Sequence, residues 1–471
     1  MFDVARTDRR NGNAALVIFL INLFVAGLII IKGSGSSAFF WTALAVIASA
    51  LPYLFAFFKR KIIFYEPIYL FLSGTIFTYI AYLLFSSKAL ELDQEALAYV
   101  MTACTFGAVA FTIGYKLNFG NFLAKILPIK NYMVDEKILG KICLKLYGLW
   151  LIFTILPFLP LGGLLDSMKS LFQNLMMFVV LGGVMIDIYL YAIASKADIG
   201  RYKYLLRSFL LACVYFVQCF LSGFSGAMAS VFGVTIIAYI KGKNTLPSIP
   251  KIIAIIVTLV VFLGYIVPYT KIFREAHWQG ENIGDSLEYA NDEFITLSQD
   301  DKIEVSLTRF SDPLFMGLKC HGLRKQNVNI SRYSGFLSFL ARFVPRFIWK
   351  DKPVSFNGNQ VGRELGVIQE DDFTTSISLP LLSNFILNGG LWGVILGMLG
   401  VGTILRLYWE WLIIRTGGNF LAFVVYFIIL FSWIFGGDEI GSLVVANVGF
   451  LGYLYIFLGF AISKEAHMQH K

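Results

Sequence analysis

Uninterrupted apolar segments of roughly 18 residues or more most constrain how this chain can fold. The first, residues 14–31, contains no charged residue, and similar runs recur along the sequence. A helix of that length matches the hydrocarbon core of a bilayer, which is roughly 30 Å thick. Hydrophobic residues make up 57% of the 471 residues and charged residues only 15%, so a soluble domain is excluded.

The predicted fold class is an all-α polytopic integral membrane protein with about twelve transmembrane helices and one large external loop. The expected spans lie at residues 14–31, 38–58, 62–85, 96–114, 142–160, 171–195, 204–221, 227–240, 251–268, 390–408, 419–436 and 443–462. The 227–240 segment is short, and its glycines leave open a broken or re-entrant segment. The expected parts are an N-terminal membrane block (1–268), an extracytoplasmic loop (269–379) and a C-terminal membrane block (380–471).

The distribution of Lys and Arg predicts the side on which each loop lies, because short cytoplasmic loops retain basic residues. Basic clusters precede the first span and follow every second span, whereas the short loops opposite hold only Lys32, Lys88 and Lys169. Both termini are therefore expected in the cytoplasm and the large loop outside. The net charge of +9 is a topological signature and does not indicate nucleic-acid binding.

The sequence lacks the common signatures of nucleotide, metal and disulfide chemistry. It contains no Walker or dinucleotide motif and no His-rich metal constellation, so no cofactor is expected. Of the five cysteines only Cys320 falls in the external loop, which excludes an external disulfide framework. The first apolar run has no convincing cleavage site and is expected to remain a helix.

The external loop changes sign along its length. Residues 275–304 are acidic with loosely spaced apolar residues, and they are interpreted as a solvated helix face in preference to a metal site. Residues 309–363 are basic, which breaks the positive-inside trend and is best explained by an anionic partner. Within this half, Arg342, Arg346 and Lys350 recur at intervals of four and would form a phosphate cradle. A basic amphipathic helix that only touches anionic lipid is the alternative.

The run VPRFIWKDKP, followed by GNQVGRELG and DDFTTSISLPLLSNFILNGGLWGVILGMLG, resembles the Wzy family of O-antigen and oligosaccharide repeat-unit polymerases. The resemblance covers residues 340–400, and the topology is similar in general. It implies a GT-C-like membrane fold and a glycosyltransferase at the outer face of the bacterial inner membrane. Such an enzyme transfers a growing glycan from undecaprenyl pyrophosphate to the next lipid-linked repeat unit. Its expected partners are these lipid-linked oligosaccharides, membrane lipids and a chain-length regulator protein.

By position, the resemblance assigns Arg346 and Lys352 to basic positions of the family and matches residues 388–390 to an Asn-small-Gly turn. Arg274 resembles a basic residue that is common after the ninth span. Asn384 departs from the family pattern, since many relatives carry an acid near that point. This departure puts a base role for residue 384 in doubt.

The chemistry requires cations for the departing pyrophosphate and a group that orients or deprotonates the attacking hydroxyl. The expected cations are Arg342, Arg346, Lys352 and Arg274, with Arg309, Arg332 and Arg363 as further substrate-binding residues. The candidates for the second role are Asp372, Glu364, Glu439 and His321. His321 has a suitable ordinary pKa near 6.5. Asp372 ranks slightly higher, because it sits where the loop re-enters the membrane and a lone loop histidine is usually a surface residue.

Two further points stay open at this stage. Asp187 lies well inside a predicted span, where an unpaired charge costs on the order of 3 kcal/mol, so it is expected to face a partner or water. A structural hydrogen bond is preferred over proton coupling. The competing functions are an O-antigen ligase acting on lipid A core, a flippase or transporter, and a non-enzymatic assembly protein.

Overall fold

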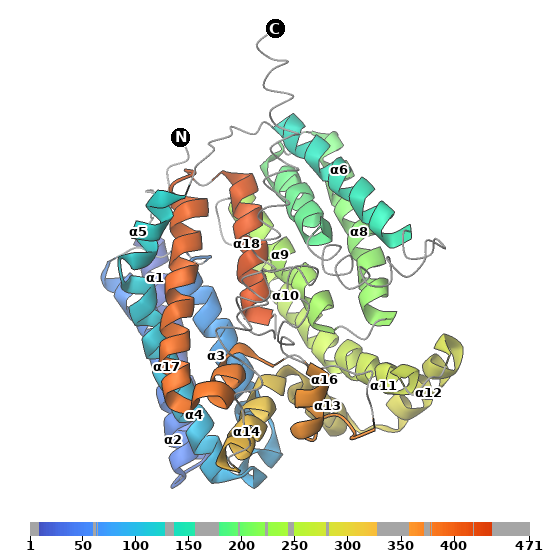
Figure 1. The fold of residues 1–471 in the computed structure, drawn as a ribbon. Helices are drawn as coiled ribbons and strands as arrows, with labels where there is room; N and C mark the ends of the chain where they lie inside the picture. The colour runs from blue at the N-terminus through green and yellow to red at the C-terminus, as the bar shows by residue number, and fades with distance from the viewer. Residues whose placement is uncertain are drawn as a thin grey trace, which may run out of the picture. The chain divides into compact units, whose positions relative to one another are not determined.

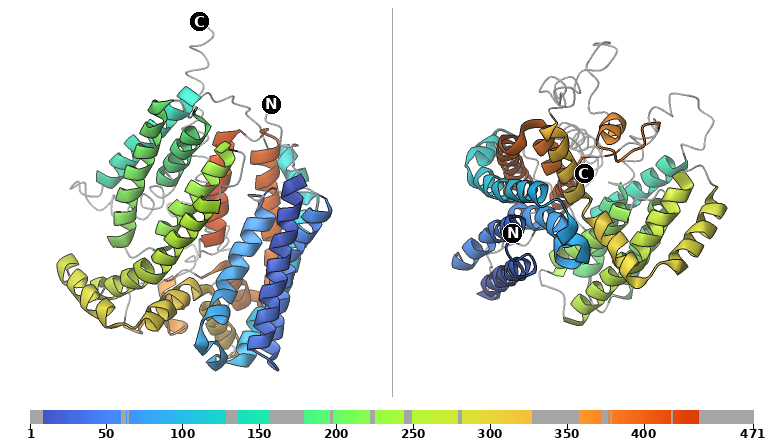
Figure 2. Two further views of the ribbon diagram at one scale, coloured as in Figure 1. Left: turned by 180° about the vertical axis from the view of Figure 1, so that it is seen from behind. Right: turned by 90° about the horizontal axis from the view of Figure 1, so that it is seen from below.

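The computed structural model describes residues 9–59, 63, 65–127, 136–155, 179–195, 198–221, 225–243, 249–278, 282–326, 358–371, 377, 379–417 and 419–435. Every regular element in these ranges is a helix (Figures 1 and 2). Six helices have the length and composition of membrane spans: Ala14–Lys32, Ser37–Phe58, Pro67–Phe85, Gln94–Lys116, Ile199–Leu221 and Leu381–Ile414. The all-helical prediction is therefore confirmed for the described ranges. The total of about twelve spans stays a prediction, and the 443–462 span lies outside these ranges.

The chain forms two compact units. Unit 1 contains residues Met1–Lys130, Phe310–Gly418 and Ile429–Gly449, and unit 2 contains Asn131–Arg309, Asn419–Ile428 and Phe450–Lys471. The predicted external loop is thus divided at Arg309, where its acidic half gives way to its basic half. The predicted division into membrane blocks and a loop describes topology and stays a prediction.

Unit 1 contains the longest described helices, and local sequence signals define the starts of some of them. Its helices are α1 (Arg9–Lys32), α2 (Ser37–Phe58), α3 (Pro67–Phe85), α4 (Gln94–Lys116), α5 (Phe119–Ile126), α14 (Asp312–Lys325), α16 (Gly358–Glu364) and α17 (Leu381–Trp409). Pro67 begins α3, later than residue 62, because proline is favoured in the first helical turn. Asp93 caps α4 by accepting hydrogen bonds from Glu95 N at 3.0 Å and Ala96 N at 3.2 Å.

Helices α4 and α17 run in parallel and pack closely through small residues. An added Cβ at Gly114 would overlap Leu399 O, and one at Gly402 would overlap Phe111 O. Only glycine allows the two backbones to approach this far, as in other membrane helix pairs. This contact positions the start of α4 beside Gly390 of α17, where the candidate site lies.

Unit 2 contains α6 (Glu136–Ile155), helix Val179–Ile193, α8 (Tyr202–Leu221), α9 (Ser225–Lys243), α10 (Ile249–Val261), α11 (Val267–Trp278), α12 (Ile283–Thr296) and α13 (Gln299–Phe310). Helix α9 is continuous, so the broken-segment alternative for residues 227–240 is wrong, and the re-entrant alternative stays a prediction. The segment predicted to end at residue 268 continues through a π-helical turn, Phe262–Ile266, into α11.

The acidic half of the predicted loop forms α12 and α13, as expected for solvated helices. Helix α12 packs on α11 through a small core of Ile272, Phe273 and Ala290. Its carboxylates at Asp285, Glu288, Asp292 and Glu293 are exposed. The surface-helix interpretation is therefore confirmed. Within the described ranges, no group of three or more His, Cys, Asp or Glu side chains could hold a metal ion.

Candidate functional site

Helix α17 consists of two helical pieces that meet at Gly390, and this bend is the centre of the candidate site (Figure 1). Gly390 has φ 58° and ψ −144°, a conformation that is essentially restricted to glycine. The first piece folds back on the second, since an added Cβ at Gly393 or Gly397 would overlap Phe385. Gly390, which the resemblance matches to an Asn-small-Gly turn, thus redirects the chain.

Helix α14 is held against this bend by buried polar contacts. Ser383 Oγ, in the first piece of α17, donates to Pro313 O at 3.1 Å and lies 3.0 Å from Tyr79 Oη of α3. Gly317 of α14 faces the side chain of Val100, where an added Cβ would lie 3.2 Å away. These contacts fix the register of α14, so the residues of its last turns face α4 and the bend.

His321 and Arg324 occupy those last turns, and both contact the bend or its neighbour Tyr99. The His321 ring stacks on the Tyr99 ring with centroids 4.0 Å apart and planes inclined by 21°. Arg324 NH1 donates a long hydrogen bond to Leu387 O at 3.4 Å. A Cβ added to Gly390 would lie 2.8 Å from Arg324 Nε and 3.0 Å from Tyr99 Oη. Tyr99, His321, Arg324, Asn388 and Gly390 together are called the α17 bend site below.

Asn388 contributes an amide whose orientation is fixed by a neighbour. Its Nδ2 donates to Asn384 O at 2.9 Å and also to Asn384 Oδ1. Two acceptors on one side require the NH2 group there, so Asn388 Oδ1 faces the other way. Asn384 is 5% exposed and serves to orient Asn388. This role agrees with the doubt about a base at residue 384.

Two polar atoms of the site are buried without a partner among the described residues: Asn388 Oδ1 and His321 Nδ1. Such atoms are rare, because an unmade hydrogen bond in the interior costs about 1–3 kcal/mol. Arg324 also forms no ion pair within the described part of the chain. A ligand that carries both a hydroxyl group and an anionic group could hydrogen-bond to Asn388 Oδ1 and His321 Nδ1 and form an ion pair with Arg324.

The electrostatics keep the imidazole neutral. Burial lowers the pKa of His321 below its ordinary value, and Lys325 and Arg324 lower it further, while Glu95 and Asp93 oppose this shift. Lys325 itself pairs with Glu95 at 2.6 Å, and both side chains are exposed, so the pair contributes little stability. His321 is therefore a neutral, half-buried proton acceptor. The expectation that a lone loop histidine lies free on the surface is wrong here.

The predicted site residues are only partly within the described ranges. Arg332, Arg342, Arg346, Lys352, Asp372 and Glu439 lie outside them. Arg274 on α11 and Arg309 on α13 belong to unit 2.

Arg363 and Glu364 lie in α16, which ends in a Schellman motif. Gly366 has φ 60°, and Val367 N donates to Gly362 O at 2.9 Å. Arg363 NH1 donates to Glu370 O at 3.3 Å across the turn that follows. Arg363 thus stabilises this turn in the structure, and its predicted role in substrate binding stays a prediction.

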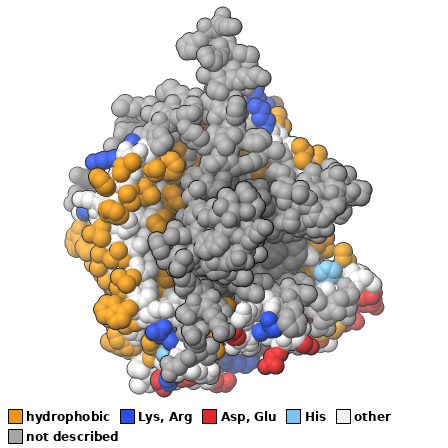
Figure 3. Space-filling model, in the orientation of Figure 1, with side chains coloured by type: hydrophobic (Ala, Val, Ile, Leu, Met, Phe, Trp, Pro, Cys, Tyr) orange, Lys and Arg blue, Asp and Glu red, His pale blue; other side chains and the backbone are white. Residues whose placement is uncertain are grey.

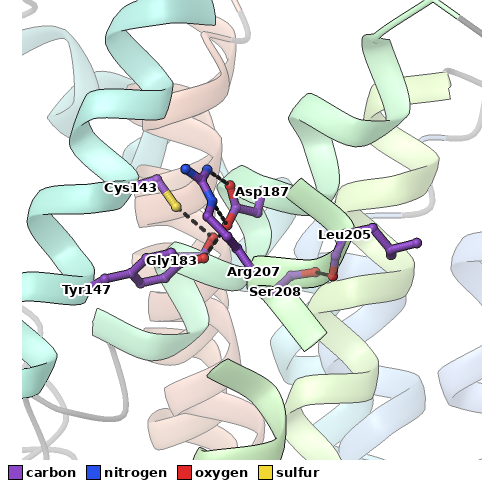
Figure 4. A network of polar contacts seen from close by, with 7 residues as sticks. All are labelled: Cys143, Tyr147, Gly183, Asp187, Leu205, Arg207 and Ser208. Carbon is purple, nitrogen blue, oxygen red and sulfur yellow. Dashed lines mark hydrogen bonds and ion pairs between the residues drawn. The ribbon is translucent and has the colours of Figure 1, made fainter. Parts of the chain in front are cut away.

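A second polar network lies in unit 2 around Asp187, which is completely buried (Figure 4). Arg207 donates from Nε to Asp187 Oδ2 at 3.2 Å and from NH2 to Asp187 Oδ1, and Tyr147 Oη donates to Oδ2. The expected partner of Asp187 is therefore confirmed as an arginine and a tyrosine. The sequence identified Arg207 only as a marker of topology. Its second role depends on the packing of α8 against helix Val179–Ile193.

Sequence reasoning missed Tyr99 and Arg324. The spacing of His321 and Arg324, one helical turn apart, is a signal for a shared face once the segment is known to be helical. Tyr99 carries no signal, because its partner is more than two hundred residues away in the chain. Comparisons of the chain with protein-family models, with curated proteins and with solved structures find no match. The chemistry of the α17 bend site is therefore the basis for a proposed function.

Proposed function

We propose that the protein is a membrane glycosyltransferase that polymerises lipid-linked oligosaccharide repeat units, with the α17 bend site at its centre. The main support for this proposal is that three groups lie together at the bend of α17: the neutral imidazole of His321, the amide oxygen of Asn388 without a hydrogen bond, and the guanidinium of Arg324 without an ion pair among the described residues. A sugar hydroxyl can donate to Asn388 Oδ1 and to the imidazole. A pyrophosphate oxygen can accept from Arg324. A glycan acceptor and an undecaprenyl pyrophosphate donor supply both groups.

In the proposed reaction, the acceptor hydroxyl attacks the anomeric carbon of the donor glycan and passes its proton to His321. The bond between that carbon and the pyrophosphate oxygen breaks, and its electron pair leaves with undecaprenyl pyrophosphate. Arg324 stabilises the departing charge together with the predicted cations Arg342, Arg346 and Lys352. The glycosyl pyrophosphate bond provides the energy, so the reaction needs no nucleotide. Asp372 is the alternative base.

The site also accords with the predicted orientation. It lies at the start of α4, which follows the short loop of Lys88, and the basic-residue distribution assigns this loop to the outer side. The proposed location is the bacterial inner membrane, with both termini in the cytoplasm. A cysteine replacing Asp285 should react with an impermeant reagent added outside, after the outer membrane is opened, whereas one replacing Lys243 should not. The reverse pattern would put the site on the wrong side.

This labelling needs only one background change. Of the five cysteines, only Cys213 is exposed. Cys213→Ser should therefore remove the reactive native thiol. Labelling of the Cys213→Ser protein before any cysteine is introduced measures the remaining background.

Gene deletion separates the proposed polymerase from its alternatives. Deletion of the gene should collapse the surface glycan ladder to core plus one repeat unit. A ligase would instead leave polymer on the lipid carrier and no glycan on lipid A core. A flippase would leave single repeat units on the cytoplasmic side, and it would not require an acceptor-hydroxyl site.

The direct test is polymerisation of defined lipid-linked repeat units by the purified protein. His321→Gln should lose roughly 100-fold to 10,000-fold in rate while substrate binding is retained. His277→Gln is the matched control, because His277 is also half-buried and stacked on an aromatic ring, that of Phe273 at 5.7 Å. Full activity of His321→Gln with an inactive Asp372→Asn would transfer the base role to Asp372. Full activity of both would remove proton transfer by either residue.

A further inference from the structure

Helix α5 has its small residues turned toward the protein and its large apolar residues turned away. Gly120 and Ala124 are buried, whereas Phe119, Phe122 and Ile126 are 57%, 59% and 68% exposed. The three exposed residues follow the helical spacing i, i+3, i+7 and form one stripe. A helix on the surface of a soluble protein has the opposite arrangement. The stripe therefore requires an apolar environment outside the protein.

This orientation is fixed by contacts within unit 1. An added Cβ at Gly120 would lie 2.7 Å from Thr403 O and 3.0 Å from Arg406 Cβ, so α5 packs directly on the last turns of α17. Arg415 NH1 donates to Ala124 O and, at 3.0 Å, to Leu127 O. The arginine thereby binds carbonyls at the C-terminal end of α5, where Ala124 O also accepts from the backbone of the C-cap residue Leu127. The exposed stripe cannot rotate inward without breaking these contacts.

The position of α5 along the membrane normal follows from helix lengths. The 23 residues of α4 extend about 34 Å, enough to cross a hydrocarbon core of about 30 Å. Helix α5 begins three residues after Lys116, the last residue of α4, and continues beside α17 from Thr403 toward Arg415. Its eight residues extend about 12 Å and cannot cross a bilayer. The helix therefore lies at the membrane boundary.

Charged side chains near α5 also indicate that this helix lies at the membrane boundary. Arg406, against which Gly120 packs, pairs with Glu66 at 3.6 Å and with Glu410. Lys116 and Lys125 are exposed on either end of the stripe, and the sequence has no acidic residue between Glu95 and Asp135. Figure 3 shows basic and hydrophobic side chains close together on the side of the molecule where Figure 1 labels α5.

We propose that α5 is an interfacial helix that binds the anionic lipid surface of the bilayer. Phe119, Phe122 and Ile126 enter the acyl region directly below the headgroups, and Lys116 and Lys125 contact lipid phosphates. The helix connects this surface to the α4 and α17 pair through Gly120 and Arg415. The proposal does not depend on the glycosyltransferase function, and its test requires no enzyme assay.

The depth of the stripe can be measured on the full chain in nanodiscs of equal parts phosphatidylglycerol and phosphatidylcholine. A nitroxide is attached at Phe122→Cys in the Cys213→Ser background, and its collisions with oxygen and with a nickel chelate are compared. At residue 122, collisions of the nitroxide with oxygen should be more frequent than collisions with the nickel chelate. Glu288→Cys, on an exposed face of α12, is the control at which the nickel chelate should dominate.

Either of two results would overturn the membrane contact. A label at residue 122 that is reached mainly by the nickel chelate would place α5 in water. A label excluded from both reagents would show that protein, such as a second copy of the chain, covers the stripe.

The choice of lipid can be measured at the same position with a fluorophore in place of the nitroxide. Brominated phosphatidylglycerol should quench it more than brominated phosphatidylcholine. Lys125→Gln should lower the local enrichment of phosphatidylglycerol about fivefold, the equivalent of about 1 kcal/mol per basic residue at the surface. The control Lys302→Gln should change nothing, since Lys302 of α13 lies over the Phe294 ring of α12, away from α5 in the chain. Equal quenching by the two lipids in the unmodified helix would refute anionic recognition.

Discussion

Gly390→Ala is the sharpest test of the α17 bend site, because this glycine is required for two independent reasons. Its φ of 58° with ψ of −144° is a conformation that other residues avoid. Its missing side chain also leaves room for its neighbours, since a Cβ would lie 2.8 Å from Arg324 Nε and 3.0 Å from Tyr99 Oη. The substitution should therefore destabilise the fold and displace the proposed pyrophosphate-binding guanidinium.

The size of the effect follows from these two terms. The backbone conformation costs a residue other than glycine about 1–3 kcal/mol. Displacement of Arg324 breaks its hydrogen bond to Leu387 O, which contributes about 1 kcal/mol. The free energy of unfolding should thus fall by about 2–4 kcal/mol.

Gly389→Ala is a matched control from the neighbouring position. A Cβ at Gly389 meets nothing within 4 Å, and its φ is not positive. Alanine in a helix is about 0.5–1 kcal/mol more favourable than glycine, so this variant should be neutral or slightly more stable. Unfolding free energies can be compared by denaturation in mixed micelles, followed by native tryptophan fluorescence. Polymerisation is measured on the same samples.

Equal stability of the two alanine variants would refute the strained bend. The double variant Gly390→Ala/Arg324→Ala separates the two terms, because it removes the overlap with Arg324 and keeps the backbone strain. Relative to Arg324→Ala alone, the double variant should be less stable by only the backbone term of about 1–3 kcal/mol, because the hydrogen bond to Leu387 O is already absent. It should not recover activity, since the cation is absent.

Three further predictions concern charge. Arg207→Ala should lower the free energy of unfolding by about 3–5 kcal/mol, because the buried Asp187 carboxylate then has no ion-pair partner. Adding Asp187→Asn should recover most of the lost stability. An unchanged denaturation curve for Arg207→Ala would contradict this prediction. Neutral His321 is the proposed base, and its pKa lies below the ordinary 6.5, so kcat/KM should be constant above pH 6.5 and should fall as the pH decreases through the lowered pKa. Lys325→Gln should shift this fall in kcat/KM to higher pH. A fall at an unchanged pH would assign the titration to another group. Arg346→Ala should abolish the polymer while the protein level stays normal, and Arg346→Lys should retain only part of the polymer. A normal glycan ladder on gels for Arg346→Ala would exclude a role for this arginine in pyrophosphate binding.

The sequence by itself determined the properties that depend on neighbouring residues. Apolar run length predicted helices such as α2 and α4 to within a few residues, because the hydrocarbon thickness and the rise of a helix define the length of a span. Exposure of the acidic α12 followed in the same way, since isolated carboxylates remain in water. The expectation of a partner for Asp187 rested on the cost of an unpaired charge inside a membrane.

Only the tertiary structure decided which groups meet. Tyr99 and His321 stack although 222 positions separate them (321 − 99), and nothing local to either residue identifies the other. Local sequence likewise identifies neither the contact between Arg324 and Gly390 nor the face of α5 that is exposed. The physical reason is that burial of a polar atom, its pKa and its unsatisfied hydrogen bonds are set by whichever helix packs against it. That choice depends on the packing of complete helices, which the period and composition of one segment do not encode.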